Sequence, residues 1–568
     1  MSHFLGVFKS TRDSIIGEKG ERFGELIYES SELQLFVKGN DNTSFWSDNK
    51  TLDRGFLVVG VGLKEISGSL KHLDIQDWKQ IYKSDNWDPE SIQGHFLFLK
   101  WQGNQLQIWN DTLGLRTAYV YQTDDGNIIF SSRLDWIAGF VPNPRISVEH
   151  FSAYWLLINQ LTTGAFLKEV HRMGPNSRVG IKRGSYTVTE HYFIPPQRKL
   201  DNSTHRFKDA LRLNVNPITQ HTVSLGLSGG LDSRTLLVLT DMPGSTHTFG
   251  GYENPDVSIA KKIAEKTEVN HYQAKPQIPL FKESEYEITD FVGQVNGTKR
   301  CSDFFLSNIM EELNQQNKLL IDGGMGEIHR RQFLGKLSFM NFRGAGGITV
   351  DQLFAALSDN KFSFFTHDLQ KNMIQAAKAQ IAEVWDKAVS QGAHLENCID
   401  LFSLWTRVSN TPAMDHGWYD SKVPAYMPFI QKNLLNLMFD VKPGEKKNGK
   451  LFKTIIKQEN KRLANLPLVK NGVEYPFSLG KYASHFYTLS KSKVSKKYND
   501  NLSKNFLLRN EEFVLDLVHS SATRQCSLYN KKQVEEKVQA FYKGAYETED
   551  QVNQWLSFEI WRRTVGLI

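Results

Sequence analysis

The sequence has few cysteines, no long apolar run and little excess charge, and each shortage argues against a class of protein. Only three cysteines occur in 568 residues, and their wide separation argues against a zinc site or a disulfide framework. No window supplies about 20 uninterrupted apolar residues, and the first residues lack a basic region followed by an apolar one. We therefore expect a cytoplasmic protein with no membrane partner.

The remaining composition is that of a soluble globular protein. Hydrophobic residues make up 40% and charged residues 23% of the chain. A net charge of +6 over this length gives little reason to expect nucleic acid as a partner, although it suits an anionic substrate such as ATP. The length predicts about two to four domains.

Residues 1 to about 195 read as short strands separated by turns. Phe56–Val61 and His95–Trp101 are apolar segments typical of β-strands. Asp124–Asn127 is a hairpin-turn signal before the apolar segment Ile128–Phe130. Strands this closely spaced predict stacked antiparallel sheets.

The most specific stretch is Ser-Gly-Gly-Leu-Asp-Ser at residues 228–233, between a short apolar strand and a leucine-rich helix. Adjacent glycines let the backbone approach a polyphosphate, and the N-terminus of a helix offers N–H groups and a positive dipole end. Asp232 would repel a phosphate unless a cation lay between them, so the stretch predicts Mg²⁺ as well. The alternative is an ordinary strand-turn-helix junction capped by a serine.

Two further strands follow this loop. Asn254-Pro255 signals the start of a helix after the strand that ends near Phe249, and His271 begins another strand. This repetition predicts a parallel, doubly wound sheet with its ligand at the carboxyl edge. Phe249 could lie against an adenine there, or be ordinary core.

The next strand, Leu319–Ile321, enters a glycine-rich turn that contains Glu327. Glu327 is either a metal-binding acid or a solvated loop acid, and Arg330 and Arg331 either hold phosphate or form surface ion pairs. Residues from about 335 to 568 are expected to be mostly helical. Val552, Trp555, Leu556 and Ile560 predict a final amphipathic helix.

Taken in order, these segments resemble the asparagine synthetase family. Residues 228–233 resemble the pyrophosphate-binding loop of the ATP pyrophosphatases. They do not form a Walker-type loop, since no Gly-Lys-Ser/Thr follows the glycines. Gly94–Phe98, Asn110–Arg116 and Phe130–Ser132 follow one another as in class II glutamine amidotransferase domains. The resemblance implies an α/β protein. An Ntn-hydrolase-like αββα antiparallel sandwich would span residues 1–195, and a doubly wound, parallel-sheet ATP pyrophosphatase domain with a helical C-terminal part would span 205–568.

This sequence departs from the family at three positions. Ser2 stands where these glutaminases use an N-terminal cysteine, and no cysteine occurs before Cys301. Gln93 replaces the family's aspartate, and Gly324 lies where asparagine synthetases carry a catalytic glutamate. We expect a glutaminase-like domain without activity that packs against or shapes the synthetase half. Ser2 as an active nucleophile remains the alternative.

The resemblance also implies the cofactors, ATP and Mg²⁺, and the residues that hold them. Asp232 and Glu327 would bind the metal, and Lys470 would be the lysine that contacts the acyl-adenylate in catalysis. The residues implied to bind ATP and pyrophosphate are Gly226, Leu227, Ser228, Gly229, Gly230, Asp232, Ser233, Phe249 and Gly323.

The implied activity is that of an AMP-forming carbon-nitrogen ligase. It would adenylate the carboxylate of a small molecule or peptide, and an amine or ammonia would then form the amide, as in β-lactam synthetases and lasso peptide cyclases. A catalytically silent scaffold or regulatory protein remains open, as does a glutamine-hydrolysing asparagine synthase that uses Ser2. A tRNA-modifying or sulfur-inserting enzyme fits less well, because cysteine pairs and a strong basic patch are missing. The sequence leaves a homodimer open.

Overall fold

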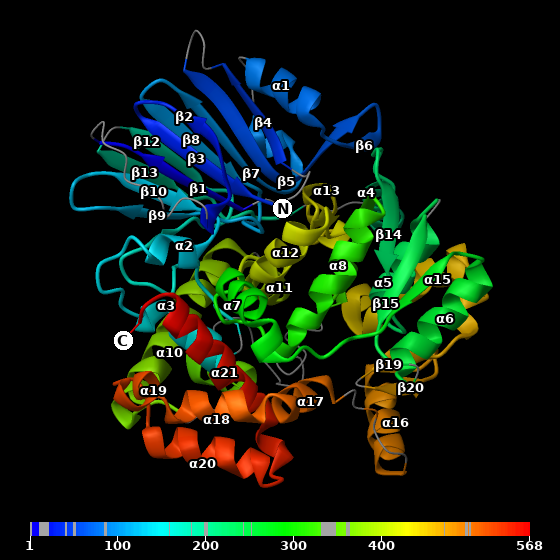
Figure 1. The fold of residues 1–568 in the computed structure, drawn as a ribbon. Coiled ribbons are helices and arrows are strands. Elements are labelled where there is room, and N and C mark those ends of the chain that lie inside the picture. The colour runs from blue at the N-terminus through cyan, green and yellow to red at the C-terminus, as the bar shows by residue number, and fades with distance from the viewer. Residues whose placement is uncertain are drawn as a thin grey trace.

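Two antiparallel sheets and one parallel sheet carry the fold (Figure 1). The prediction of a mixed α/β protein with antiparallel sheets before a parallel one is confirmed. Ser2 and Arg331 lie outside the residues described. The computed structural model describes residues 3–10, 22–39, 43–48, 53–84, 88–157, 159–182, 184–197, 203–241, 244–251, 253–330, 348–358, 364–392, 394–470, 472–494, 498 and 501–567.

The two antiparallel sheets form the first part of the chain and stack face to face. Their strand orders are β11-β9-β10-β1-β3-β2 and β13-β12-β8-β7-β5-β4, with β6 paired to β5. Leu35 and Phe130 of the first sheet share one buried cluster with Leu57 and Leu97 of the second. The strands are β1 (His3–Phe8), β2 (Glu25–Glu29), β3 (Leu33–Lys38), β4 (Thr43–Asp48), β5 (Arg54–Ile66), β6 (Ser69–His72), β7 (Gln93–Gln102), β8 (Gln105–Asn110), β9 (Tyr119–Gln122), β10 (Ile128–Ser131), β11 (His171–Arg172), β12 (Arg178–Lys182) and β13 (Ser185–Thr189).

Helices cover the outer face of each sheet. Helix α1 (Ile75–Lys83) begins with a capping box formed by Asp74 and Asp77, and it buries Trp78 against the outward side chains of β5 and β7. Helices α2 (Leu134–Ala138) and α3 (Val148–Leu157) share a cluster with the outward side chains of β1 and β10. The layers are therefore helix, sheet, sheet and helix.

The parallel sheet has the strand order β16-β15-β14-β17-β18. The chain passes outward from β14 to β15 and β16, then returns to the other side of β14 with β17, so the connections diverge between β14 and β17. Ligands of such sheets bind at the carboxyl ends of the strands beside this point. The strands are β14 (Thr222–Gly226), β15 (Ser245–Phe249), β16 (His271–Ala274), β17 (Lys318–Ile321) and β18 (Ala425–Tyr426).

Helices surround this sheet and form most of the remaining chain, as predicted. The short strands β19 (Leu468–Lys470) and β20 (Val473–Tyr475) pair with each other. No helix among the described residues is long and apolar enough to cross a membrane. The helices are α4 (Ser203–Val215), α5 (Leu231–Leu239), α6 (Pro255–Thr267), α7 (Glu285–Gln294), α8 (Leu306–Gln315), α9 (Val350–Leu357), α10 (His367–Gln391), α11 (Leu395–Arg407), α12 (Thr411–Lys422), α13 (Lys432–Leu435), α14 (Pro443–Lys446), α15 (Lys450–Glu459), α16 (Lys481–Val494), α17 (Leu502–Arg509), α18 (Glu511–His519), α19 (Ser521–Gln525), α20 (Lys531–Tyr542) and α21 (Glu549–Thr564).

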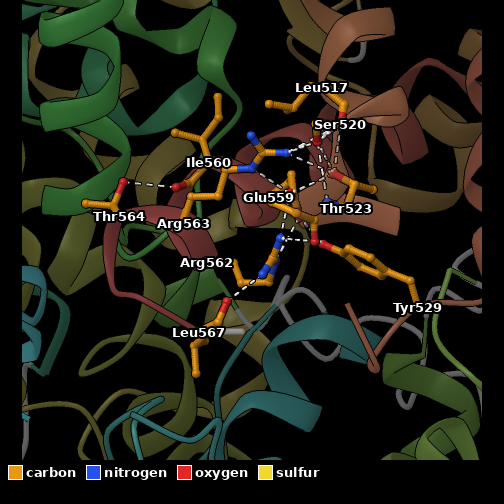
Figure 2. Close-up of polar contacts among 11 residues, drawn as sticks. Leu517, Ser520, Thr523, Tyr529, Glu559, Ile560, Arg562, Arg563, Thr564 and Leu567 are labelled. Atoms are coloured by element: carbon orange, nitrogen blue, oxygen red, sulfur yellow. Dashed lines mark hydrogen bonds and ion pairs between the residues drawn. The ribbon is translucent and has the colours of Figure 1, made fainter. Parts of the chain in front are cut away.

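The final helix, α21, corrects one sequence expectation. It was expected to be amphipathic, but it is buried around most of its circumference, including the polar residues Asn553, Glu559 and Arg562. Figure 2 shows Glu559 surrounded by donors from its own helix and from Thr523 and Tyr529. The buried polar side chains have partners on α17, α19 and α21, which lets a mixed apolar and polar helix lie inside the protein.

Candidate active site

A cavity of about 560 Å³ opens at the carboxyl ends of β14, β15 and β17. Its volume lies within the range of about 300–1,000 Å³ that is usual for small-molecule sites. Gly229 and Glu327 do not line the cavity. The predicted site residues that line it are Gly226, Leu227, Ser228, Gly230, Asp232, Ser233, Phe249, Gly323 and Lys470.

The loop after β14 uses its backbone N–H groups internally. Ser228 N–H donates to Ser233 Oγ at 3.0 Å, and Gly229 N–H donates to Asp256 Oδ1 at 3.0 Å. The N-cap of α5, Gly230, makes no side-chain capping bond. The first turn of α5 therefore keeps N–H groups for an anion at the cavity. The N–H groups of Ser228 and Gly229 hold the loop closed through Ser233 and Asp256.

Gly229 fixes the position of β19. A Cβ on Gly229 would lie 2.4 Å from Val469 Cγ2, and Val469 N–H donates to Gly229 O at 3.1 Å. This close approach requires glycine and brings the next residue, Lys470, to the cavity. Among the described residues, Lys470 Nζ has no hydrogen-bond or ion-pair partner, so its charge is available to a ligand.

Replacing Gly229 with alanine is expected to lower the free energy of unfolding by about 1–3 kcal/mol, because the new methyl group overpacks Val469. Gly417→Ala is the matched control. Gly417 lies in α12, and a Cβ placed on it would meet no atom within 4 Å among the described residues. That substitution should therefore stabilise the protein by about 0.4–1 kcal/mol. Urea unfolding of both variants measures the difference. Equal midpoints for the two variants would contradict the tight packing of Gly229.

Asp232 is the charged residue of the loop at residues 228–233. Arg330 Nη2 donates to its Oδ2 at 2.5 Å, whereas its Oδ1 is buried and accepts no hydrogen bond from the described residues. Burial raises the pKa of the Asp232 carboxyl, the Arg330 guanidinium lowers it, and the net shift is upward. A desolvated carboxylate favours a cation beside it, and Arg330 holds that place in this structure.

Glu327 lies apart from the cavity lining. Its Oε1 is 3.6 Å from Arg407 Nε, yet its charge is near enough to raise the pKa of Asp232. Within the described residues, no group of three or more His, Cys, Asp and Glu side chains is placed to hold a metal ion. Magnesium beside a nucleotide usually takes one or two carboxylates and completes its shell with phosphates and water. Glu327 as the second metal acid stays a prediction.

Phe249 lies in the cavity wall rather than in the core. Its side chain is 36% exposed, and its ring centroid is 5.9 Å from that of His247. The alternative that Phe249 is ordinary core is therefore wrong. Its contact with an adenine stays a prediction.

Several residues of the cavity were missed by the sequence interpretation. Asp322 directly follows β17 and accepts a hydrogen bond from Gly324 N–H through Oδ1 at 2.9 Å, and burial raises its pKa. An acid directly after a buried strand at the carboxyl edge was a signal that could have found it. Asp256 and Lys447 were missed as well, whereas Arg330, which the sequence analysis considered for phosphate binding, lines the cavity together with Lys453. The lining thus joins four cations to three acids, which suits a polyanion bound together with a divalent cation.

The first half of the chain contacts the second through the beginning of β7. Gly94 N–H donates to Gln431 Oε1 at 2.8 Å, and Met427 N–H donates to His95 Nε2 at 2.9 Å. Asn433 N–H donates to Gln93 Oε1 at 3.0 Å. Gln93 therefore forms part of a contact between the two halves of the chain.

Cys301 offers no reactive thiol. The side chain is fully buried beside Ser557, and burial raises the pKa of its thiol to about 12. A thiol of that pKa supplies almost no thiolate near neutral pH.

No protein-family model and no curated protein sequence matches the chain. Matching solved structures include one described as the allosteric regulatory enzyme of purine biosynthesis, with 11% identity and a TM-score of 0.20 over 48% of this chain. The match spans 58% of that enzyme, which is less than two thirds of its length. Glutamine phosphoribosylpyrophosphate amidotransferase from B. subtilis, complexed with ADP and GMP, matches with 11% identity and a TM-score of 0.20, covering 66% of this chain and 86% of that one.

Proposed function

We propose that the protein is an ATP-dependent, AMP-forming ligase that joins a carboxylate to an amine or ammonia. The observation that carries the proposal is the cavity at the carboxyl edge of the parallel sheet. It combines the uncapped N-terminus of α5, the desolvated carboxylate of Asp232 and the ammonium group of Lys470, which has no partner among the described residues. The resemblance of residues 228–233 to a pyrophosphate-binding loop selects adenylation over γ-phosphoryl transfer.

The reaction would have two balanced steps. A carboxylate oxygen would bond to the α-phosphorus as the bond to the bridging oxygen breaks, and pyrophosphate would leave with the electron pair. The amine nitrogen would then attack the acyl carbon, AMP would leave, and the nitrogen would lose a proton. Mg²⁺ would neutralise charge on the leaving phosphates.

The chain's own residues would act on the pyrophosphate side. The first turn of α5 and the Ser228 hydroxyl would donate hydrogen bonds to phosphate oxygens, and Lys470 would offset the charge that develops on the leaving group. Asp232 would hold the cation between itself and the phosphates. Phe249 would provide an apolar face for the base.

The first-half domain would not supply ammonia in this proposal. The family's cysteine is absent from the N-terminal sequence, and Gln93 makes a contact with the second half instead. The nitrogen source would then be free ammonia or, as we favour, an amine of the substrate. Release of glutamate from glutamine that is lost in Ser2→Ala would contradict this part of the proposal.

Carboxylate-dependent exchange between ATP and labelled pyrophosphate tests the proposed activity. We expect Mg²⁺-dependent binding of ATP and pyrophosphate, and exchange that appears with some members of a panel of amino acids, peptides and sugar acids. Asp232→Asn should abolish the exchange. Failure of the wild-type protein to bind either ligand would refute the proposal. Binding without exchange across the panel would favour the silent scaffold or regulatory protein.

A further inference from the structure

An arginine from the turn after β17 already occupies the accessible side of Asp232. Arg330 lines the same cavity, and the two side chains are 16% and 21% exposed. The second oxygen, Oδ1, is covered, because a Cβ placed on Gly326 would lie 2.6 Å from it. A cation that enters from the cavity therefore reaches Asp232 through Oδ2, the oxygen that Arg330 holds.

We infer that Arg330 takes the place of the divalent cation in the ligand-free protein and transfers to a phosphate oxygen when that cation binds Asp232. The inference rests on the proposed function, since it takes the ligand to carry a pyrophosphate group. Two positive groups on one carboxylate oxygen repel each other, so entry of the metal favours release of Arg330.

The surroundings of Arg330 suit both positions. In this structure the guanidinium neutralises a desolvated carboxylate that would otherwise destabilise the loop. The Arg330 guanidinium carbon lies 5.9 Å from the ring centroid of buried Phe452. Its planar fork can bind phosphate through two hydrogen bonds, as a lysine cannot.

This exchange makes metal and pyrophosphate binding cooperative. Metal binding frees Arg330 for the phosphate, and phosphate offers Arg330 a partner that replaces Asp232. Each ligand therefore raises the affinity of the other by the same factor. The proposed movement of Arg330 from Asp232 to phosphate would thus couple the two binding events, which a permanent ion pair could not do.

Binding titrations of Arg330→Ala test the inference without any turnover. Mn²⁺ alone, followed by electron paramagnetic resonance, should bind the variant about 5- to 100-fold more tightly than the wild type, within the usual range of coupling. Pyrophosphate at saturating Mg²⁺, measured by calorimetry, should bind about 10- to 100-fold more weakly, because a charged hydrogen bond is lost. Arg212→Ala is the control. Arg212 forms a 2.6 Å ion pair with Glu459 outside the cavity, so both affinities should match the wild type.

Two outcomes would overturn the inference while leaving the proposed function intact. Wild type that binds pyrophosphate, with Arg330→Ala unchanged in both titrations, would show that Arg330 never leaves Asp232 for the ligand. Weaker Mn²⁺ binding in the variant would show that Arg330 orients Asp232 for the metal. Wild type that binds no pyrophosphate would instead refute the proposed function.

Arg330→Lys carries the test if the alanine variant does not fold. It should keep the wild-type Mn²⁺ affinity, because the charge remains, and lose pyrophosphate affinity, because the fork is gone.

Discussion

Lys470→Ala is expected to lower the rate of carboxylate-dependent ATP–pyrophosphate exchange by about 10²–10³-fold, the usual loss when one preorganised charge donor is removed. Lys470 lines the cavity beside the loop, and no described residue neutralises its ammonium group. Its charge is therefore free to offset the charge that develops on the leaving pyrophosphate. The thermal midpoint should change little, because the alanine removes no hydrogen bond or ion pair to a described residue.

The control for Lys470 is another lysine of the same region. Lys457 is exposed on α15 and does not line the cavity, so Lys457→Ala should keep wild-type exchange. Lys470→Arg should retain part of the rate, since the charge remains while its position changes. Unchanged exchange in Lys470→Ala would remove Lys470 from the reacting groups and leave Lys447 or Lys453 as the candidate cation.

The positions of the strand ends could be predicted from the sequence because each is a local property. The apolar segment before residue 226 and the cap at Asn254 mark their own elements, and Asn254 does accept a hydrogen bond from Asp256 N–H. Parallel strands place their carboxyl ends at one edge. That rule brings Ser228, Phe249 and Gly323 to one cavity although they are far apart in the sequence.

The partners of the site's charges could not be predicted, since they depend on tertiary packing. Arg330 pairs with Asp232 across 98 positions of the chain, and Asp256 reaches back to Gly229 across 27 positions. Periodicity describes only the element that carries it and gives no pairing between elements. Helix α21 shows the same limit. Its apolar spacing suggested one buried face, whereas donors on α19 and after it allow Glu559 to be buried as well.

Glu559→Ala is expected to destabilise the protein by about 3–5 kcal/mol, because it leaves Arg562 as a buried charge without its partner. Glu559 is fully buried and accepts hydrogen bonds at 2.7–2.9 Å from Arg562, Arg563, Thr523 and Tyr529 (Figure 2). Chemical unfolding measures the loss. Glu535→Ala is the control, since Glu535 is 50% exposed and lies 3.6 Å from His519, so its removal should change stability by less than about 0.5 kcal/mol.

The pH dependence separates the charge of Glu559 from its packing. Burial alone would raise the pKa of Glu559, but hydrogen bonds and the charge of Arg562 outweigh it and hold the pKa below the ordinary value of about 4.5. A lowered folded-state pKa means that this stabilisation is fully present above about pH 4.5 and is lost as the pH falls through the lower folded value. The wild type should therefore exceed Glu559→Gln in stability at pH 7, and the difference should shrink below pH 4.5. A difference independent of pH would show that shape, rather than charge, makes Glu559 important.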